Sequence, residues 1–212
     1  MISMVAEADA ARSSEGAGSM PFIGRAVEIG PDRLVVERVL DLQEDLHLAD
    51  HAFVHAPGVK PLSGCLPVLP MTMSLEAMAE VAACLAPGLG LLRLEDVKAS
   101  RWIELADVDR LALRISATRV EREAETGALR IDAAIQPQGQ DAPAISAAIW
   151  FGSRYQTRVS LAPKTFVNPY RLALPGEEIY RRRHLFHGPS YQCLSGDIVL
   201  AEASAYCEMT VP

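Results

Sequence analysis

The sequence predicts an α+β fold in which an antiparallel sheet wraps around one buried helix. One apolar segment rich in alanine has the spacing of a helix, and several later segments alternate apolar and polar residues as half-buried strands do. Turn-forming residues separate these segments. A strand, then a helix, then a run of strands is typical of a curved sheet that encloses a central helix.

The N-terminal residues 1–21 are expected to be a flexible leader or linker, because most of them are small and polar. Order is expected to begin near Phe22. The first strand is predicted over Arg33–Asp41, a β-branched and apolar run that follows a Gly-Pro-Asp turn. Four prolines within residues 56–70 exclude a regular helix from the next loop.

The helix is predicted over Met71–Leu85, where apolar residues recur at helical spacing. Thr72 or Ser74 is the expected N-cap, and Pro87-Gly88 is expected to end the helix. Because the segment is rich in alanine and carries few charges, we expect it to be buried around most of its circumference. Its methionines suit either a core or the lining of an apolar pocket.

After the helix we predict an antiparallel meander of four strands, so that the first unit spans 22–152. The strands are expected at Leu91–Glu104, Arg110–Glu121, Ala128–Gln136 and Ala142–Phe151. Further on, two strand-like pieces at 196–200 and 203–211 begin such a pattern again without completing it. We therefore expect residues 153–212 to be a linker and the start of a second unit that is cut short.

The composition excludes several classes of function. Half of the 212 residues are hydrophobic, which indicates a globular protein. The 20 basic and 27 acidic residues give a net charge of −7, which argues against a nucleic-acid partner. No apolar run approaches the roughly 20 residues that cross a bilayer, and the N-terminus lacks the features of a secretory signal. We expect a cytoplasmic protein with no membrane partner.

Metal, nucleotide and serine-hydrolase chemistry also lack sequence support. The four cysteines are at least 14 residues apart and form no metal-ligand spacing, so they are expected to be reduced thiols; they are Cys65, Cys84, Cys193 and Cys207. Phosphate-binding loops, nucleophile elbows and zinc-protease motifs are absent from the sequence. We expect no metal ligands.

His51 is the first candidate for chemistry. A histidine can accept a proton at physiological pH, and this one precedes the predicted buried helix. Free backbone N–H groups at a helix N-terminus stabilise a developing enolate oxygen, so the pairing suits proton abstraction beside a thioester carbonyl. A histidine that only caps the loop is the alternative interpretation. His47 and His55 are neighbouring candidates for the same role.

Glu76 is the second candidate, because it lies within the apolar helix. A buried carboxylate is costly unless it is paired or functional, and burial raises its pKa toward that of a general acid. The alternative is that Glu76 lies on one wet edge of the helix with Glu80, four residues later. Two histidines, His184 and His187, flank an aromatic segment just before a Gly-Pro turn, which suits either a structural corner or a site.

Arg181-Arg182-Arg183 is a short basic run. It could meet an acidic carrier or a phosphate, or form a solvated surface.

Three segments resemble the dehydratase domains of polyketide synthases and polyunsaturated fatty-acid synthases. They are Leu-Ala-Asp-His at 48–51, Leu-Pro-Val-Leu-Pro-Met-Thr-Met-Ser-Leu-Glu-Ala-Met-Ala-Glu at 66–80, and Leu-Phe-His-Gly-Pro-Ser-Tyr-Gln at 185–192. Their order and rough spacing match over about residues 22–212. The family has a double hotdog fold, so the resemblance implies a first hotdog over 22–152 and an incomplete second one.

The resemblance also implies roles. In the family, a His of the first hotdog and an Asp on the second hotdog's helix remove water from a 3-hydroxyacyl chain tethered to an acyl carrier protein. His51 matches that His and Pro70 matches the proline that opens the first helix, with Met71 after it. The early second-hotdog motif matches Phe186-His187-Gly188-Pro189. The residues expected to bind substrate here are Pro70, Met71, His187, Gly188 and Pro189.

Two departures from the family pattern bear on the site. Eighteen residues separate His51 from Pro70, more than in the family, which leaves Gly64 and Cys65 as candidates for the carbonyl-binding turn. No Asp stands in a matching setting, so the catalytic acid is expected beyond Pro212. The helix start also resembles single-hotdog 3-hydroxyacyl-carrier-protein dehydratases, in which a Glu at the place of Glu76 is catalytic and pairs with a His from the partner subunit.

The expected activity is therefore that of a 3-hydroxyacyl-[acyl carrier protein] dehydratase, a hydro-lyase. It needs no cofactor, because the substrate arrives on the carrier's phosphopantetheine arm and the thioester acidifies the proton. An acyl carrier protein and neighbouring synthase domains are the expected partners, and an unpaired sheet edge predicts self-association. The alternatives are a polyketide cyclase of product-template type, a non-catalytic dehydratase-like domain and a hotdog thioesterase.

Overall fold

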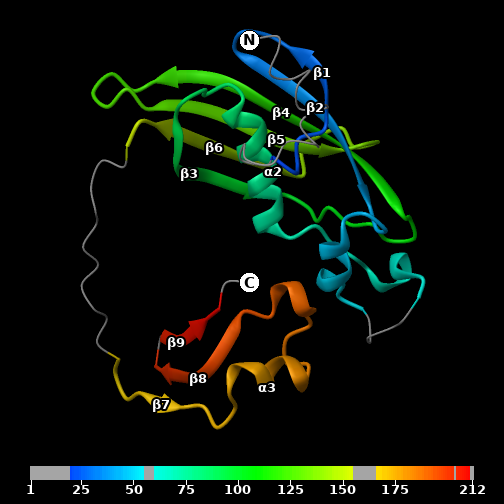
Figure 1. Cartoon of the computed structure of the whole chain (residues 1–212), viewed down its shortest axis with the longest axis vertical. Coiled ribbons are helices and arrows are strands. Elements are labelled where there is room, and N and C mark those ends of the chain that lie inside the picture. The colour runs from blue at the N-terminus through cyan, green and yellow to red at the C-terminus, as the bar shows by residue number, and fades with distance from the viewer. Residues whose placement is uncertain (1–19, 55–59, 155–165, 203, 211–212) are drawn as a thin grey trace.

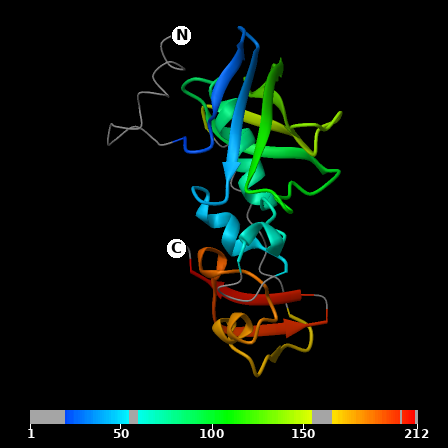
Figure 2. The same ribbon diagram turned by 90° about the vertical axis from the view of Figure 1, so that its right-hand side faces the viewer.

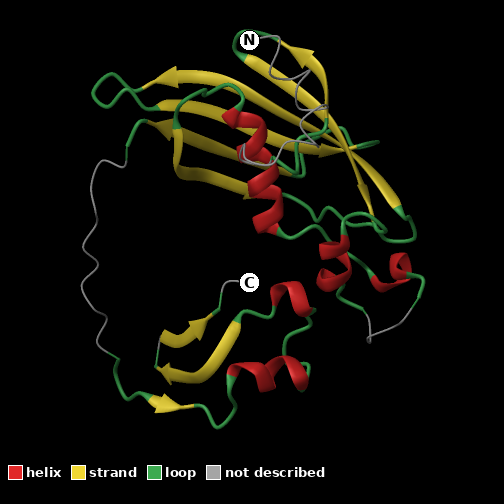
Figure 3. Ribbon diagram, in the orientation of Figure 1, coloured by secondary structure: helices red, strands yellow, loops and turns green. Residues whose placement is uncertain are grey.

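The computed structural model describes residues 20–54, 60–154, 166–202 and 204–210. Two antiparallel sheets lie at opposite ends of the molecule, one of six strands and one of three. Short 3₁₀ turns lie between them in both views (Figures 1 and 2). The expected α+β architecture is confirmed, and its sheet content greatly exceeds its helix content (Figure 3).

The six-stranded sheet has the order β1-β2-β4-β5-β6-β3. Its strands are β1 (Arg25–Ile29), β2 (Arg33–Asp41), β3 (Gly90–Ala99), β4 (Arg110–Arg122), β5 (Leu129–Pro137) and β6 (Ile145–Gly152). The predicted strand over Arg33–Asp41 is confirmed, whereas β1 was not predicted. β1 is short, and four of its five residues are exposed, so it carries little hydrophobic signal.

The predicted four-strand meander is wrong in one respect. Only β4, β5 and β6 follow one another as neighbours, because β3 pairs with β6 at the far edge of the sheet. Most of β3 is exposed, and its pairing with β6 is irregular, as is common at a sheet edge. A local alternation pattern cannot tell which strand lies beside which, because pairing is decided by the connections between strands.

The helix α2 (Met71–Ala83) packs against β2 and β4–β6 on one face of this sheet (Figure 3). Residues 77–82 are all buried, which confirms the predicted burial around most of the helix. The predicted N-cap is wrong: Pro70 is the capping residue, and the Ser74 hydroxyl donates instead to the Pro70 carbonyl at 3.1 Å. Ser74 already lies inside the first turn, so its hydroxyl bonds back along the helix.

The main hydrophobic core lies between α2 and the six-stranded sheet. Its most completely buried side chains include Met78 on the helix and Ile115, Ile131, Ile135 and Ile149 on the strands. Alternate residues of β5 point into it, as the period of two in a strand requires. A six-stranded sheet closed over one long helix therefore buries a complete core.

The second part of the chain is smaller. Its sheet has the order β7-β8-β9, with β7 (Tyr170–Arg171), β8 (Leu194–Ala201) and β9 (Ser204–Met209), and the helix α3 (Gly176–Arg181) packs on β8. Among its described hydrophobic residues, Tyr180 and Ile198 are the buried ones. The strand-like pieces predicted near 196–200 and 203–211 correspond to β8 and β9.

Three 3₁₀ turns occupy the space between the two sheets: η2 (Leu46–His51), η3 (Leu62–Cys65) and η4 (Pro189–Tyr191). η2 and η4 are in contact although they are about 140 residues apart in the sequence. All four cysteines are free thiols. No helix in the described part of the chain is long and apolar enough to cross a membrane.

Candidate active site

His51 is the last residue of η2, and its ring is fixed by the backbone near the start of α2. Its Nδ1 lies 2.9 Å from the carbonyl oxygen of Val68, two residues before the helix cap. A carbonyl oxygen can only accept, so Nδ1 carries the proton of the neutral ring. The lone pair is therefore on Nε2, and the tautomer is the one that a base needs.

The protonation state of His51 also suits a base. Burial of the half-buried ring lowers its pKa, and the hydrogen bond to the Val68 carbonyl opposes this only in part. Desolvation disfavours the charged imidazolium, so the ring is mostly neutral at physiological pH. His51 is therefore a held, unprotonated imidazole beside the N-terminal end of a helix.

Aromatic rings surround His51 on several sides. Phe53, from its own segment, lies at a centroid distance of 5.4 Å. Three rings come from the second part of the chain: Phe186 at 5.1 Å, His187 at 5.5 Å and Tyr191 at 5.7 Å. The base predicted in the first unit is thus enclosed by the motif predicted in the second.

Two polar atoms of this enclosure have no hydrogen-bond partner within the described part of the chain. They are His187 Nδ1 and the Tyr191 hydroxyl, both inaccessible to solvent. Burial raises the pKa of Tyr191 to about 12, with a smaller contribution from Asp50, so the phenol remains protonated. Burial also lowers the pKa of His187, with a further lowering from His51. Both groups are therefore buried without a hydrogen-bond partner among the described residues.

Asp50 connects the two parts of the chain next to His51. Its backbone carbonyl accepts the Gly188 N–H at 2.7 Å. Its carboxylate Oδ2 accepts both the Ser190 N–H at 2.9 Å and the Ser190 hydroxyl at 2.5 Å. A Cβ on Gly188 would lie 2.2 Å from Asp50 Oδ1, so only glycine fits at this approach. The Gly-Pro motif and the Asp-His motif therefore form one interlocked unit.

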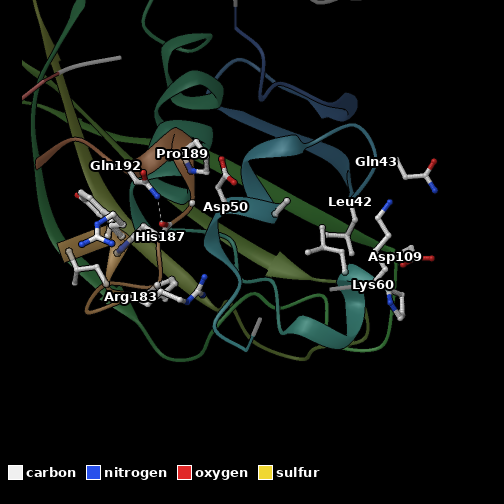
Figure 4. A pocket seen from close by; sticks show the side chains of 17 residues that line it. Leu42, Gln43, Asp50, Lys60, Asp109, Arg183, His187, Pro189 and Gln192 are labelled. Atoms are coloured by element: carbon white, nitrogen blue, oxygen red, sulfur yellow. Dashed lines mark hydrogen bonds between the residues drawn. The ribbon is translucent and has the colours of Figure 1, made fainter. Parts of the chain in front are cut away.

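A cavity of about 880 Å³ opens beside this unit. Figure 4 shows Asp50 between two groups of lining residues, with Leu42, Lys60 and Asp109 on one side and Arg183, His187 and Gln192 on the other. One group belongs to the first part of the chain and the other to the second. His51 itself does not line the cavity, whereas its neighbours Asp50 and His187 do.

The structure separates the two carboxylates of α2. Glu76, the predicted acid, is exposed, so it is not the buried carboxylate that the prediction required. Glu80 is the buried one, at 6% exposure, and accepts the Phe22 N–H at 2.7 Å. Burial raises the pKa of Glu80 to about 7, against the effect of the Phe22 hydrogen bond. The interpretation of a wet edge shared by Glu76 and Glu80 holds for Glu76 alone.

The predicted carbonyl-binding turn lies in η3. The Gly64 N–H already donates to the Pro61 carbonyl at 3.1 Å, so it is engaged within the turn. Cys65 is fully buried, and its carbonyl accepts the Val54 N–H. Pro70 is buried as the cap of α2, and Met71 begins the helix with an exposed side chain. The helix start therefore fits an oxygen-binding role better than Gly64 does.

The remaining candidates lie outside the ring cluster. His47 packs against Phe22 at 5.9 Å, and His184 is exposed. Arg181 and Arg182 pair with Glu178, while Arg181 and Arg183 line the cavity. His55 lies outside the described residues. No group of three or more His, Cys, Asp or Glu side chains that could hold a metal ion occurs in the described ranges.

The fold and the site together define a class. The fold is a hotdog fold of the double-hotdog type found in polyketide synthase dehydratase domains, of which this chain covers a part. The dehydratase domain from the CurF module of curacin polyketide synthase matches with a TM-score of 0.62 and 14% identity, over 91% of this chain and 66% of that one.

Other solved structures agree with this class. The dehydratase domain from the terminal module of rifamycin polyketide synthase matches with a TM-score of 0.56 and 16% identity, over 92% of this chain and 67% of that one. A bifunctional dehydratase-cyclase domain from ambruticin biosynthesis has a TM-score of 0.50 and 19% identity, over 91% of this chain and 62% of that one. The chain thus spans about two thirds of these domains' length. No protein-family model and no curated protein matches the sequence.

The structure brings the predicted His51 and the 186–189 motif together, whereas Asp50, Ser190 and the buried state of Glu80 were not predicted. Asp50 was visible only as the residue before His51, and an aspartate there is ordinary for a 3₁₀ turn. Its function as a bridge depends on Gly188 and Ser190 coming to it from a distant segment. No spacing rule connects residues 140 positions apart.

Proposed function

We propose that this chain is part of a dehydratase domain that removes water from a 3-hydroxyacyl chain carried on an acyl carrier protein. The observation that carries the proposal is the state of His51: its Nδ1 proton is donated to the Val68 carbonyl, which leaves the lone pair on Nε2, and burial lowers its pKa so that the ring is neutral. The resemblance in fold to polyketide synthase dehydratase domains supports the same reaction class.

In the proposed reaction, His51 Nε2 takes the proton from the carbon next to the thioester carbonyl. The electrons of that C–H bond form the new double bond as the C3–O bond breaks, and the hydroxyl leaves as water after receiving a proton. Backbone N–H groups at the start of α2, around Met71, stabilise the enolate oxygen. No metal or organic cofactor takes part, because the thioester acidifies the proton.

The acid that protonates the leaving hydroxyl is proposed to come from outside these 212 residues. About a third of the CurF dehydratase domain has no counterpart in this chain. Glu76 is exposed and has no described contact with His51, so it is the weaker candidate for this acid. The catalytic pair is therefore divided between this chain and another segment.

The proposed partners follow from the substrate. The phosphopantetheine arm of the carrier would enter through the cavity beside His187, Gly188 and Pro189, where Lys60, Arg181 and Arg183 supply positive charge. Neighbouring synthase domains are proposed as further partners. Self-association through the open sheet edges is also proposed, and light scattering at micromolar concentration would contradict it by showing only a monomer.

The test uses the longest natural polypeptide that contains these residues. It is offered a 3-hydroxyacyl pantetheine thioester, and the enoyl product is followed by mass spectrometry. His51→Ala should lower the rate by about 10²–10⁴-fold, as expected for loss of a general base. The control is His184→Ala, which removes an exposed histidine outside the ring cluster. A folded native protein that forms no enoyl product would refute the proposal.

The pH profile gives a second readout. A base works only when unprotonated, so the rate should rise with pH through the pKa of His51. Because burial lowers that pKa, the rise should be centred below pH 6.5.

A cyclase is the second candidate function, because a dehydratase-cyclase domain is among the similar structures. It would use the same base to assist ring closure. A substrate that carries an internal nucleophile separates the two, since a cyclase gives a ring and a dehydratase stops at the enoyl thioester. A non-catalytic domain would give neither product.

A further inference from the structure

Asp50 occupies a position that the proposed chemistry does not use. It is not a base, because its carboxylate is already bonded by two donors from Ser190. Its carbonyl accepts a third donor, the Gly188 N–H. All three donors come from the second part of the chain, and Asp50 is the residue directly before His51.

The second part of the chain buries few hydrophobic residues of its own, and its Phe186 stacks on Phe53 of the first part at a centroid distance of 4.3 Å. Its buried hydrophobic residues are Tyr180 and Ile198, within the described ranges. The aromatic rings that enclose His51 nevertheless come from this part, at Phe186, His187 and Tyr191. These three residues flank Gly188 and Ser190, the two residues that Asp50 binds. The hydrogen bonds to Asp50 therefore lie within the same segment that supplies the rings around His51.

The fit of Gly188 supports the same interpretation. A Cβ at this position would lie 2.2 Å from Asp50 Oδ1 and 2.8 Å from Asp50 Cα, well inside contact distance. The backbone of η4 therefore approaches η2 as closely as a glycine allows. Hydrogen bonds to a charged acceptor are among the stronger ones in proteins, so the contact is well suited to fix one arrangement.

We infer that Asp50 is a positioning residue, which clamps the 186–191 segment against His51 and so builds the enclosed wall of the active site. The role of this contact in an active site rests on the proposed function, but the contact itself can be tested without any substrate. It assigns Asp50, Gly188 and Ser190 a common role. The clamp sets the surroundings of the base and takes no part in proton transfer.

The first experiment needs no substrate. The ring protons of His51 are titrated by NMR in the 212-residue chain, in the native sequence and in Asp50→Ala, Asp50→Asn and Ser190→Ala. Native His51 should titrate below pH 6.5, and Asp50→Ala should move its pKa up toward 6.5 as the wall loosens and water reaches the ring. The ring contacts from His51 to His187 and Tyr191 should weaken in parallel.

The sign of this shift separates a clamp from a simple charge effect. His187 and the Tyr191 phenol face His51 from the packed elements, besides the uncharged Phe53 and Phe186, and the Asp50 carboxylate belongs to the preceding residue of the chain. Removing a nearby negative charge lowers the pKa of a histidine, whereas removing its cover raises it. Asp50→Asn keeps an acceptor oxygen for Ser190 and should shift His51 less than Asp50→Ala does.

The matched control is Asp197→Asn, which removes an exposed carboxylate of β8 that pairs with Arg171 far from the ring cluster. It should leave the His51 titration unchanged. If Asp50→Ala does not fold, the milder variant Ser190→Ala tests the inference instead. It removes only the hydrogen bond from the Ser190 hydroxyl and should still raise the pKa of His51. A downward or absent shift with all ring contacts intact would overturn the inference.

The second experiment measures turnover in the longest natural polypeptide. Misplacement of the wall should lower kcat by about 10–100-fold in Asp50→Ala, with partial rescue in Asp50→Asn. A native protein without turnover would refute the proposed function and leave the NMR result standing. Normal turnover in Asp50→Ala would overturn the clamp and leave the proposed function intact.

Discussion

The two sheets of this protein differ in how they are stabilised. The six-stranded sheet encloses α2 and a continuous hydrophobic core, with Met78 and four isoleucines fully buried. Within the described residues, the three-stranded sheet packs against the six-residue helix α3 and has two buried hydrophobic residues. Burial of side chains therefore stabilises the first sheet far more than the second, whose part of the chain contacts the first through the Asp50 hydrogen bonds and through stacking of Phe186 on Phe53.

This difference explains where the site is built. The well-packed part supplies the proposed base His51, which follows the buried Leu48 in η2 and is bonded to Val68 near the start of α2. The weakly covered part supplies the wall, which is held by hydrogen bonds to Asp50 together with the stacking of Phe186 on Phe53. Regions with few buried contacts open at lower free energy, so a wall of this kind can move while the base stays fixed.

The largest expected effect tests the difference between the hydrophobic core of the six-stranded part and the few buried residues of the three-stranded part. Met78→Ala should destabilise the six-stranded part by about 2–5 kcal/mol, because it leaves a cavity among fully buried side chains. Ile198→Ala should affect only the exchange of amides around β7–β9 and leave those of β4–β6 unchanged. Hydrogen exchange resolved by residue measures both. Equal loss of protection across both sheets in Ile198→Ala would show that they unfold together.

The next effect tests the clamp from its other side. Gly188→Ala should cost about 1–3 kcal/mol, because the new methyl group overlaps Asp50 and forces η2 and η4 apart. Denaturant unfolding gives the loss, and a nuclear Overhauser contact between His51 and His187 reports the separation. Gly139→Ala is the comparison: nothing lies within 4 Å of its added Cβ, so its cost comes only from the backbone. An unchanged contact between the His51 and His187 rings in Gly188→Ala would contradict the clamp.

The smallest effect concerns Glu80. Its pKa of about 7 in the folded protein is above the ordinary value of 4.5, so the folded state binds the extra proton between these pH values. Glu80 therefore contributes stability that is fully present below pH 4.5 and is lost as pH rises through 7. The free energy of unfolding should fall between pH 5 and pH 8, and Glu80→Gln should make that fall smaller by about 1–2 kcal/mol.

Urea unfolding at the two pH values measures this contribution. Glu44→Gln is the control, since it removes an exposed carboxylate and should leave the pH dependence unchanged. The assigned pKa would be contradicted if the stability of the native protein did not change between pH 5 and pH 8. It would also be contradicted if that stability rose with pH more steeply than the stability of Glu80→Gln.

The sequence predicted those elements whose signal is local. The strand at 33–41 and the helix from Met71 carry their own periodicity, and both formed where expected. β1 and the place of β3 were missed, because a short exposed strand has no pattern and strand order depends on chain connections. Glu76 and Glu80 lie on one helix, and only packing against Phe22 shows which of them is buried.

The same division holds for the site. By itself the sequence determined the fold class and marked His51 and the motif at 186–189 as candidates, because each depends on residue type and nearby spacing. Only the tertiary structure decided that Asp50 binds Gly188 and Ser190 and that rings from both parts surround His51. Those contacts join segments about 140 residues apart in the sequence. They stabilise the protein only after folding has brought the two segments together, at the cost of closing a long loop.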